Sequence, residues 1–286
     1  MAYDLQFPAS DGISLHVRLH EPKGVSRGDV LCLPGLTRDW RDFEDLAAAL
    51  AERGYRVVAP DFRGRGLSAH DPDPMHYHIP YEAIDTLQVM ASLKIRGAHF
   101  IGTSRGGMVT MYLATIARDK ILSATLNDIG PVLEMKGLMR IASYVGKERS
   151  IASWDDAIAA LQRSNPGFDA WSIQEWEQFA RATFVESAHG LKMLYDPAVG
   201  HVFTMLDPST PFPTLWPWYD ALNGIPTLII RGENSDLLSS STCTEMLAHS
   251  SVAKLFVARG EAHAPMLGRA KTRDMIIDFL SNGTTV

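Results

Sequence analysis

The chain has 286 residues, of which 46% are hydrophobic and 21% are charged, and its formal net charge is −6. This length and apolar content suit one large or two small globular domains with a sizeable buried core. The negative charge, together with the absence of any run of like charges, argues against nucleic acid and anionic membranes as partners.

Two further features of the sequence bear on its cellular setting. The N-terminal residues lack a basic segment followed by an apolar one, and no stretch reaches the roughly 18 apolar residues that span a bilayer. Cys32 and Cys243 lie far apart, which fits neither a disulfide framework nor a zinc cluster. We therefore expect buried thiols, a cytoplasmic protein and no membrane association.

The first two predicted strands form a hairpin. Residues 5–7 and 13–19 alternate in polarity around the turn sequence Ser-Asp-Gly. Six short apolar runs follow, each typical of a strand that is covered on both faces: 30–33, 57–59, 98–101, 121–126, 227–230 and 253–257. Segments with helical spacing separate most of them: 43–50, 84–91, 108–115 and, at the end, 275–279. The alternation predicts an α/β fold with a doubly wound, mostly parallel, eight-stranded sheet.

One long segment interrupts this alternation. Residues 131–217 contain helical stretches at 134–144, 154–162, 173–186 and 190–195, several tryptophans, and no convincing strand. We predict that they form an α-helical cap, or lid, over the carboxyl edge of the sheet, where doubly wound folds bind ligands. The predicted core domain then comprises residues 1–130 and 218–286.

The most informative motif is Gly102-Thr103-Ser104-Arg105-Gly106, which lies between a predicted strand and a predicted helix. A serine on such a sharp turn is lifted clear of the sheet, and the flanking glycines remove the Cβ atoms that would block the turn. The pattern is typical of a nucleophile elbow.

A serine hydroxyl needs a histidine to accept its proton and an acid to orient that histidine. His263 follows the last predicted strand in a loop punctuated by glycine and proline, and Asp236 follows the strand before it. The chain order Ser104, Asp236, His263 is the one expected for this architecture. Asp128, which also comes just after a strand, is a competing candidate for orienting His263.

Acyl transfer also requires backbone N–H groups that stabilise an oxyanion. The amide of Arg105, which follows the serine, is one predicted donor, and the amide of Leu36 in Leu33-Pro34-Gly35-Leu36-Thr37 is the other. Trp40 lies just after this loop and is a candidate wall of the substrate pocket. It could equally pack under the first helix.

Together these motifs resemble the α/β-hydrolase fold superfamily, in its capped esterase, lactonase and C–C hydrolase-like branch. The resemblance extends over most of the chain through Leu33-Pro34-Gly35-Leu36, the segment 61–68, the elbow, Asp236 and His263. Two positions depart from the usual pattern. Pro34 replaces a histidine, and Arg105 replaces an uncharged residue whose side chain here could form an internal salt bridge or bind a substrate carboxylate.

The sequence thus predicts a serine hydrolase of a small to medium carboxylic ester or lactone, acting through an acyl-enzyme without a cofactor. Hydrolysis of a C–C bond in a vinylogous diketone is the first alternative, and a non-catalytic ligand receptor is the second. Asp128 and Arg105, like Trp40, are possible substrate contacts. A metal site in the His- and Asp-rich segment 70–78 is not expected. The protein could be a monomer or a homodimer.

Overall fold

The computed structural model describes residues 1–147, 151–204, 206–207, 209–210 and 212–282. In this part of the chain an eight-stranded sheet has the strand order β1-β2-β4-β3-β5-β6-β9-β10. The strands are β1 (Ala2–Pro8), β2 (Ser14–His20), β3 (Gly28–Leu33), β4 (Tyr55–Pro60), β5 (Ala98–Thr103), β6 (Ile121–Asn127), β9 (Thr227–Gly232) and β10 (Ala253–Ala258). β2 pairs antiparallel with β1 and β4, and the other six strands of this sheet, β3, β4, β5, β6, β9 and β10, are parallel to one another. The predicted doubly wound, mostly parallel sheet is confirmed.

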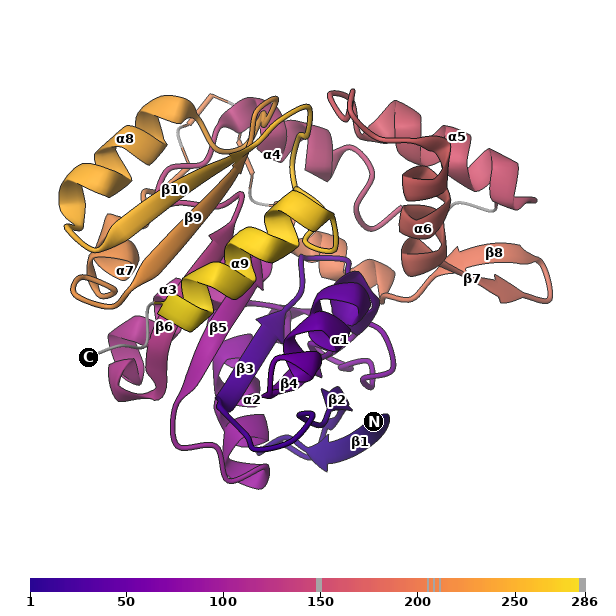
Figure 1. Ribbon diagram of the computed structural model, residues 1–286. Helices are drawn as coiled ribbons and strands as arrows, with labels where there is room; N and C mark the ends of the chain where they lie inside the picture. The colour runs from indigo at the N-terminus through magenta and orange to yellow at the C-terminus, as the bar shows by residue number, and fades with distance from the viewer. Residues whose placement is uncertain (148–150, 205, 208, 211, 283–286) are drawn as a thin grey trace.

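Helices cover both faces of this sheet. Successive residues of β3 point to opposite faces: Leu31 and Leu33 enter one buried cluster, whereas Val30 and Cys32 enter the other. The first cluster lies under α2 (Ile79–Ser92), α3 (Arg105–Ile116) and α8 (Ser240–His249), and the second under α1 (Glu44–Glu52) and α9 (Ala270–Asn282). Figure 1 shows α1 and α9 in front of the sheet. A near-continuous apolar strand is the sequence signature of this two-sided burial.

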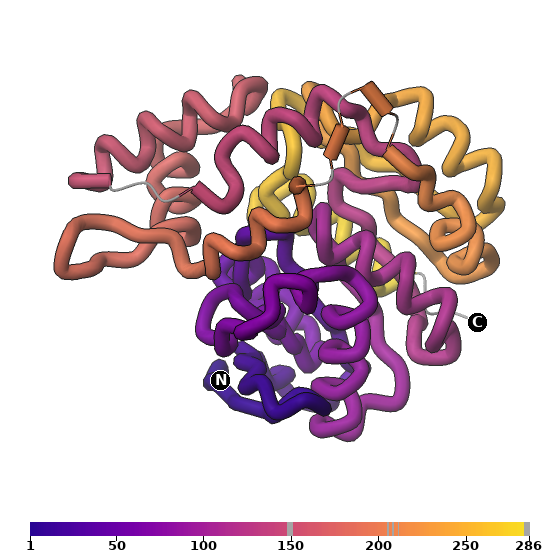
Figure 2. The backbone as a smooth tube through the Cα atoms, turned by 180° about the vertical axis from the view of Figure 1, so that it is seen from behind, coloured from indigo at the N-terminus to yellow at the C-terminus, as the bar shows by residue number. Residues whose placement is uncertain are grey.

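Residues 131–217, called the inserted segment below, connect β6 to β9. They contain α4 (Met135–Ala142), α5 (Trp154–Ser164), α6 (Ile173–Thr183), the start of α7 (Trp216–Asp220), and a hairpin of β7 (Phe184–Ser187) and β8 (Gly190–Met193). Short 3₁₀ helices lie at Trp40–Phe43, Pro74–His76, Arg118–Lys120 and Pro197–Phe203. Figures 1 and 2 show that the inserted segment lies over one end of the sheet and projects to one side.

The hairpin corrects the prediction of a helix over residues 190–195 and the statement that the inserted segment lacks a strand. Gly190 has φ +106°, in a region that glycine enters without steric cost, and this allows the chain to reverse after Ser187. Phe184 and Leu191 bury their side chains against the neighbouring helices, which fixes the register of the short strands.

Aromatic rings form the centre of the inserted segment. Phe168 and Trp171 lie with ring centroids 4.3 Å apart, and Trp176 contacts Trp171 at 4.8 Å. Trp171 Nε1 donates to Glu261 of the core, 3.1 Å away, so the cluster is also attached to the loop that carries His263. Among the described residues, no helix has both the length and the apolar character needed to cross a membrane.

Candidate active site

Ser104 stands at the turn between β5 and α3 with φ +50° and ψ −111°, a conformation rare for a non-glycine residue. A Cβ atom on Gly106 would lie 2.0 Å from the carbonyl oxygen of Leu33, and one on Gly102 would lie 2.5 Å from the backbone of Gly106. Larger residues at these two positions would push the turn away from the sheet. The strand–turn–helix context of the motif is therefore present in the fold.

The structure brings Ser104 and His263 together. Ser104 Oγ lies 3.0 Å from His263 Nε2, within hydrogen-bond distance. The other ring nitrogen, His263 Nδ1, lies 2.8 Å from Asp128 Oδ2. Serine, histidine and carboxylate thus form a continuous hydrogen-bonded chain, and this geometry is the one in which a serine can transfer its proton to a histidine.

The Asp128 carboxylate is completely buried, and both of its oxygens have hydrogen-bond partners. Its Oδ1 accepts a hydrogen bond from the Gly232 amide at 2.7 Å, and its Oδ2 accepts one from Ser235 Oγ at 2.5 Å as well as facing His263. These donors come from the end of β9 and the loop after it. They hold the carboxylate in one orientation, which in turn fixes the plane of the imidazole ring.

The prediction that Asp236 orients His263 is wrong. Both oxygens of Asp236 bind Arg140 of α4, at 2.6 Å from Nε and 2.8 Å from Nη2. Burial would raise the pKa of the Asp236 carboxyl, but the Arg140 guanidinium outweighs it and lowers that pKa, and His263 contributes a smaller effect in the same direction. Asp236 therefore anchors the inserted segment to the core, close to His263 but not bonded to it.

The positions of the two aspartates relative to the strands explain why Asp128, and not Asp236, contacts His263. Asp128 directly follows β6, which lies beside β5, so its side chain emerges at the sheet edge next to the elbow. Asp236 lies beyond the end of β9, in a loop that α4 reaches: a Cβ on Gly137 of that helix would lie 2.6 Å from the Asp236 carbonyl oxygen. This close approach allows Arg140 to bind the Asp236 carboxylate.

Two residues that the sequence analysis missed support this arrangement. Ser235 binds Asp128, and Asn127 Nδ2 donates to the carbonyl oxygen of Pro265 at 3.0 Å, which holds the loop carrying His263. Asn127 is the last residue of β6 and is fully buried. A polar residue at the carboxyl end of a buried strand is the signal that could have singled it out.

A buried ion chain connects the elbow to the loop that contains Leu36. Glu82, which has no exposed side-chain surface, lies 2.6 Å from Arg105 Nε and 2.8 Å from Arg65 Nη2. Arg65 Nε in turn donates to the carbonyl oxygen of Leu36 at 2.8 Å. Burial would raise the pKa of Glu82, but the two guanidinium groups outweigh it and lower that pKa. One carboxylate is thus connected to both residues whose amides are the predicted oxyanion donors, directly to Arg105 and through Arg65 to Leu36.

Two of the possible substrate contacts, Arg105 and Trp40, have other partners in the structure. The Arg105 side chain forms the internal salt bridge with Glu82, and its Nη2 donates to the Tyr77 carbonyl oxygen at 3.0 Å. The Trp40 ring lies 6.3 Å from the His16 ring and under the Arg18 guanidinium, 4.8 Å away. Trp40 therefore packs against the core instead of walling the pocket around Ser104.

A pocket of about 150 Å³, called the inner pocket below, opens onto Ser104 and His263. Its walls include Leu36 of the core and, from the inserted segment, Phe168, Trp171 and Phe179. A mostly apolar pocket with a few convergent polar groups is typical of a small-molecule site. The inserted segment therefore contributes the apolar side of the site.

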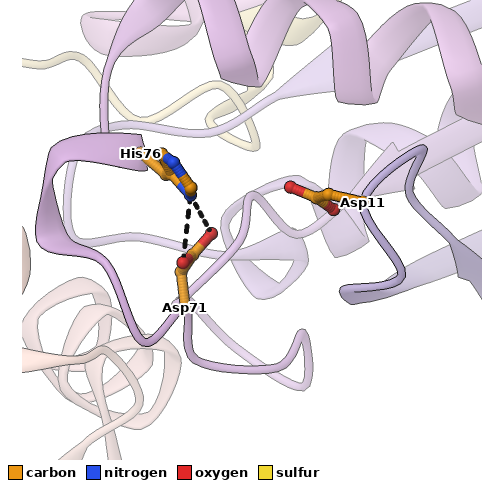
Figure 3. A group of neighbouring side chains, drawn as sticks. All are labelled: Asp11, Asp71 and His76. Carbon is orange, nitrogen blue, oxygen red and sulfur yellow. Dashed lines mark hydrogen bonds and ion pairs between the residues drawn. The ribbon is translucent and has the colours of Figure 1, made fainter.

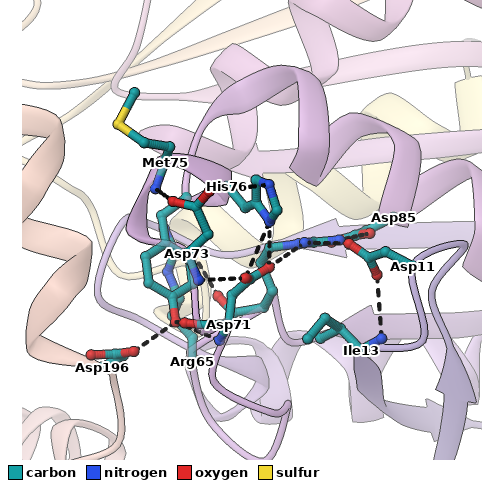
Figure 4. Close-up of polar contacts among 11 residues, drawn as sticks. Asp11, Ile13, Arg65, Asp71, Asp73, Met75, His76, Asp85 and Asp196 are labelled. Carbon is teal, nitrogen blue, oxygen red and sulfur yellow. Dashed lines mark hydrogen bonds and ion pairs between the residues drawn. The ribbon is translucent and has the colours of Figure 1, made fainter.

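Among the described residues, one group of side chains could offer ligands to a metal ion: Asp71 and His76 of the His- and Asp-rich segment, together with Asp11 from the turn between β1 and β2. Figure 3 shows His76 pointing at Asp71, and its Nδ1 lies 3.0 Å from Asp71 Oδ2. A guanidinium group is already bound there, because Arg63 Nη1 lies 2.8 Å from Asp11 Oδ2 and 2.6 Å from Asp71 Oδ2. A metal ion would have to displace this cation, so the cluster is an ion-pair network (Figure 4), in which Asp71 is buried and Asp11 is exposed.

We expect Arg63→Met to lower the free energy of unfolding by about 3–5 kcal/mol, because it leaves the buried carboxylates of Asp71 and Asp85 without their cation. Burial alone would lower the pKa of Arg63, but hydrogen bonds with Asp85 and Asp11 raise it. Urea denaturation at neutral pH measures the change. Lys23→Met, which removes an exposed ion pair with Glu52, serves as the control and should change little. Equal stability of the two variants would contradict this account.

Comparison with known proteins shows the family to which the chain belongs. The model of the alpha/beta hydrolase family matches residues 30–273. The chain belongs to this family. A solved alpha/beta hydrolase from Novosphingobium aromaticivorans is 38% identical, covers 98% of each chain and superposes with a TM-score of 0.90. The recognised resemblance is thus confirmed.

Relatives of this alpha/beta hydrolase include proteins named as a hydrolase and as an esterase. A 3-hydroxybutyrate-oligomer hydrolase from Cupriavidus necator is 32% identical over 243 residues, which is 82% of each chain. Esterase YbfF from Escherichia coli is 26% identical over 73% of this chain and 76% of its own length. The family and these relatives identify the chain as a hydrolase.

Proposed function

We propose that this alpha/beta hydrolase is a serine hydrolase that cleaves a carboxylic ester or lactone of small to medium size. The hydrogen-bonded chain from Ser104 through His263 to Asp128, at the mouth of an apolar pocket, carries the proposal. The named activities of its relatives support an ester substrate, and esters of hydroxy acids are the first candidates because of the 3-hydroxybutyrate-oligomer hydrolase.

The geometry supports the following reaction. Ser104 Oγ attacks the carbonyl carbon while His263 Nε2 takes its proton, and the amides of Leu36 and Arg105 stabilise the oxyanion that forms. The bond to the leaving alcohol breaks as His263 returns the proton to that oxygen. Water, deprotonated by His263, then attacks the acyl group, and the carboxylic acid leaves as Ser104 recovers its proton. Asp128 holds the imidazole and stabilises its charged form throughout.

The inserted segment would act in this reaction as a cap. It supplies the apolar wall of the inner pocket, and its attachment through Arg140 and Asp236 holds that wall against the loop beside His263. Exclusion of water by such a wall strengthens the electrostatic interactions around the oxyanion.

The two alternative functions receive less support. Binding of a substrate carboxylate by Arg105 would have favoured C–C bond hydrolysis, and that side chain is instead paired with buried Glu82. A receptor would need none of the hydrogen bonds that align Ser104, His263 and Asp128. Ester hydrolysis uses each of them.

The proposal is tested with p-nitrophenyl esters of graded acyl length and a few lactones, assayed with wild type and Ser104→Ala. We expect wild-type activity to peak at short to medium acyl groups, and Ser104→Ala to lower kcat by about 10⁶-fold. Activity retained by the alanine variant would refute the serine mechanism. Wild-type activity that rises steadily toward long-chain lipids would refute the proposed substrate size.

We also expect Glu82→Gln to lower kcat by about 10–100-fold with little change in KM. Loss of the carboxylate removes the ion pairs of Arg65 and Arg105, so the two oxyanion donors lose their alignment. A displacement of about 1 Å in such a group can lower the reaction rate about 10²-fold. Steady-state kinetics well below the melting temperature separate this effect from instability. The exposed pair residue Glu52, changed to glutamine, is the control.

Arg65→Lys provides a second test of the same contact if Glu82→Gln does not fold. It keeps a positive charge beside Glu82 but removes the planar group that binds the Leu36 carbonyl oxygen. We expect a fall in kcat again, with KM preserved. A folded variant with wild-type kcat would show that this contact does not position the donor.

A further inference from the structure

A second, larger cavity adjoins the inner pocket. Its volume is about 600 Å³, and we call it the outer cavity. The two spaces share five wall residues: Thr37, Arg38, Tyr144, Asn165 and Phe179. A substrate whose ester group reaches Ser104 could therefore extend past these residues. The inner pocket, about four times smaller, holds only the reacting end of such a molecule.

The lining of the outer cavity combines buried apolar side chains with two exposed lysines. Buried apolar walls come from α5 and the β7–β8 hairpin, including Leu161, Phe184 and Leu191. Lys147 and Lys192 also line the cavity and are exposed. Among the described residues that line it, none is an aspartate or a glutamate. Such a lining suits a chain that is apolar along its length and negatively charged at its end.

The third cation in the wall, Arg38, is held differently. Its guanidinium binds both oxygens of Asp42, and it also donates to Thr183 Oγ1 of the inserted segment. Its charge is therefore balanced, and it stacks over the Phe179 ring at 4.6 Å. Arg38 shapes the passage between the two cavities, whereas Lys147 and Lys192 form no ion pair with any acidic residue in the described part of the chain.

We propose that the outer cavity binds the carboxylate end of an extended ester substrate while the ester bond itself lies at Ser104. The chemical class that fits is a linear ester or oligoester of a hydroxy acid, or a half-ester of a dicarboxylic acid, with one free carboxylate remote from the scissile bond. This inference rests on the proposed ester hydrolysis and adds a specificity site to it. Binding of the remote group would raise kcat/KM for the charged substrate over a neutral one.

The test compares two matched substrate series. Mono-p-nitrophenyl esters of linear dicarboxylic acids carry the free carboxylate, and the same compounds capped as methyl esters lack it. At low salt we expect the wild-type kcat/KM to be about fivefold or more higher for the charged ester than for the capped one. A ratio of this size corresponds to the interaction energy of one screened ion pair in a partly buried site. The preference should shrink at about 1 M salt, where the Debye length is about 3 Å.

The variant Lys147→Gln/Lys192→Gln should reduce this preference to near unity while kcat/KM for p-nitrophenyl acetate stays unchanged. Lys254→Gln/Lys271→Gln is the matched control, because it removes the same charge from exposed positions on β10 and α9 outside both cavities. The inference is overturned if wild type shows no preference for the carboxylate, or if the first double variant keeps it. Failure of the proposed function would look different, as p-nitrophenyl acetate itself would not be hydrolysed through Ser104.

Discussion

His263→Ala is expected to lower kcat for ester hydrolysis by about 10⁶-fold, because the serine then has no group to accept its proton and the leaving alcohol has none to donate one. The imidazole lies 3.0 Å from Ser104 Oγ, and the described structure brings no other histidine within hydrogen-bond distance of that oxygen. Steady-state kinetics with a p-nitrophenyl ester measure the loss. KM should change little, since the histidine contributes mainly to the transition state.

His249→Ala is the matched control for this substitution. His249 is also paired with an aspartate, lying 2.8 Å from Asp220, and it stacks on Trp216. It is not one of the residues that line the inner pocket. We expect its replacement to leave kcat within about twofold, the scale of an exposed substitution. A His263→Ala enzyme that kept more than a small fraction of wild-type kcat would refute the role assigned to the imidazole.

Asp128→Asn should lower kcat by about 10⁴-fold while the fold is retained, as expected when an asparagine holds the histidine in the wrong tautomer. Asn is nearly isosteric, so the hydrogen bond from the Gly232 amide to Oδ1 can persist. The kinetic measurement is accompanied by a thermal melt, which reports whether the loss of activity accompanies loss of structure.

Asp236→Asn distinguishes the two carboxylates. It removes the charge that Arg140 binds, so we expect reduced stability and an altered fit of α4, with kcat within about tenfold of wild type. A fall in kcat of the size predicted for Asp128→Asn would mean that Asp236, as the sequence order suggested, acts on the histidine. Wild-type kcat in Asp128→Asn would equally contradict the geometry.

The sheet and the nucleophile elbow could be predicted from the sequence because both depend on local sequence patterns. Apolar runs such as 98–101 become strands buried on both faces. The glycines around Ser104 belong to a local motif, although the need for a glycine at position 106 also comes from the Leu33 carbonyl oxygen of the neighbouring strand β3. The prediction of Ser104 and His263 followed from their places after strands. Both indeed lie at the carboxyl edge of the sheet, within hydrogen-bond distance.

The choice between Asp128 and Asp236 depended on contacts that no local pattern reports. Arg140, which binds Asp236, is 96 positions away in the chain and belongs to a helix whose docking angle the sequence does not specify. The sequence left an internal salt bridge of Arg105 as one option but could not name its partners, because Arg65, Glu82 and Arg105 come from a loop, α2 and α3. The β7–β8 hairpin has strands of four residues, too short for periodicity to distinguish from a helix.

The rate of labelling by a fluorophosphonate probe, mapped by mass spectrometry, tests most directly whether Ser104 is activated by His263 and Asp128. Trypsin cleavage after Arg96 and Arg105 releases residues 97–105, which include Ser104. We predict an adduct on Ser104 in wild type and in Asp236→Asn, strongly slowed labelling in Asp128→Asn, and none in Ser104→Ala or His263→Ala. An adduct on another peptide, or labelling of wild type no faster than of Asp128→Asn, would contradict the account.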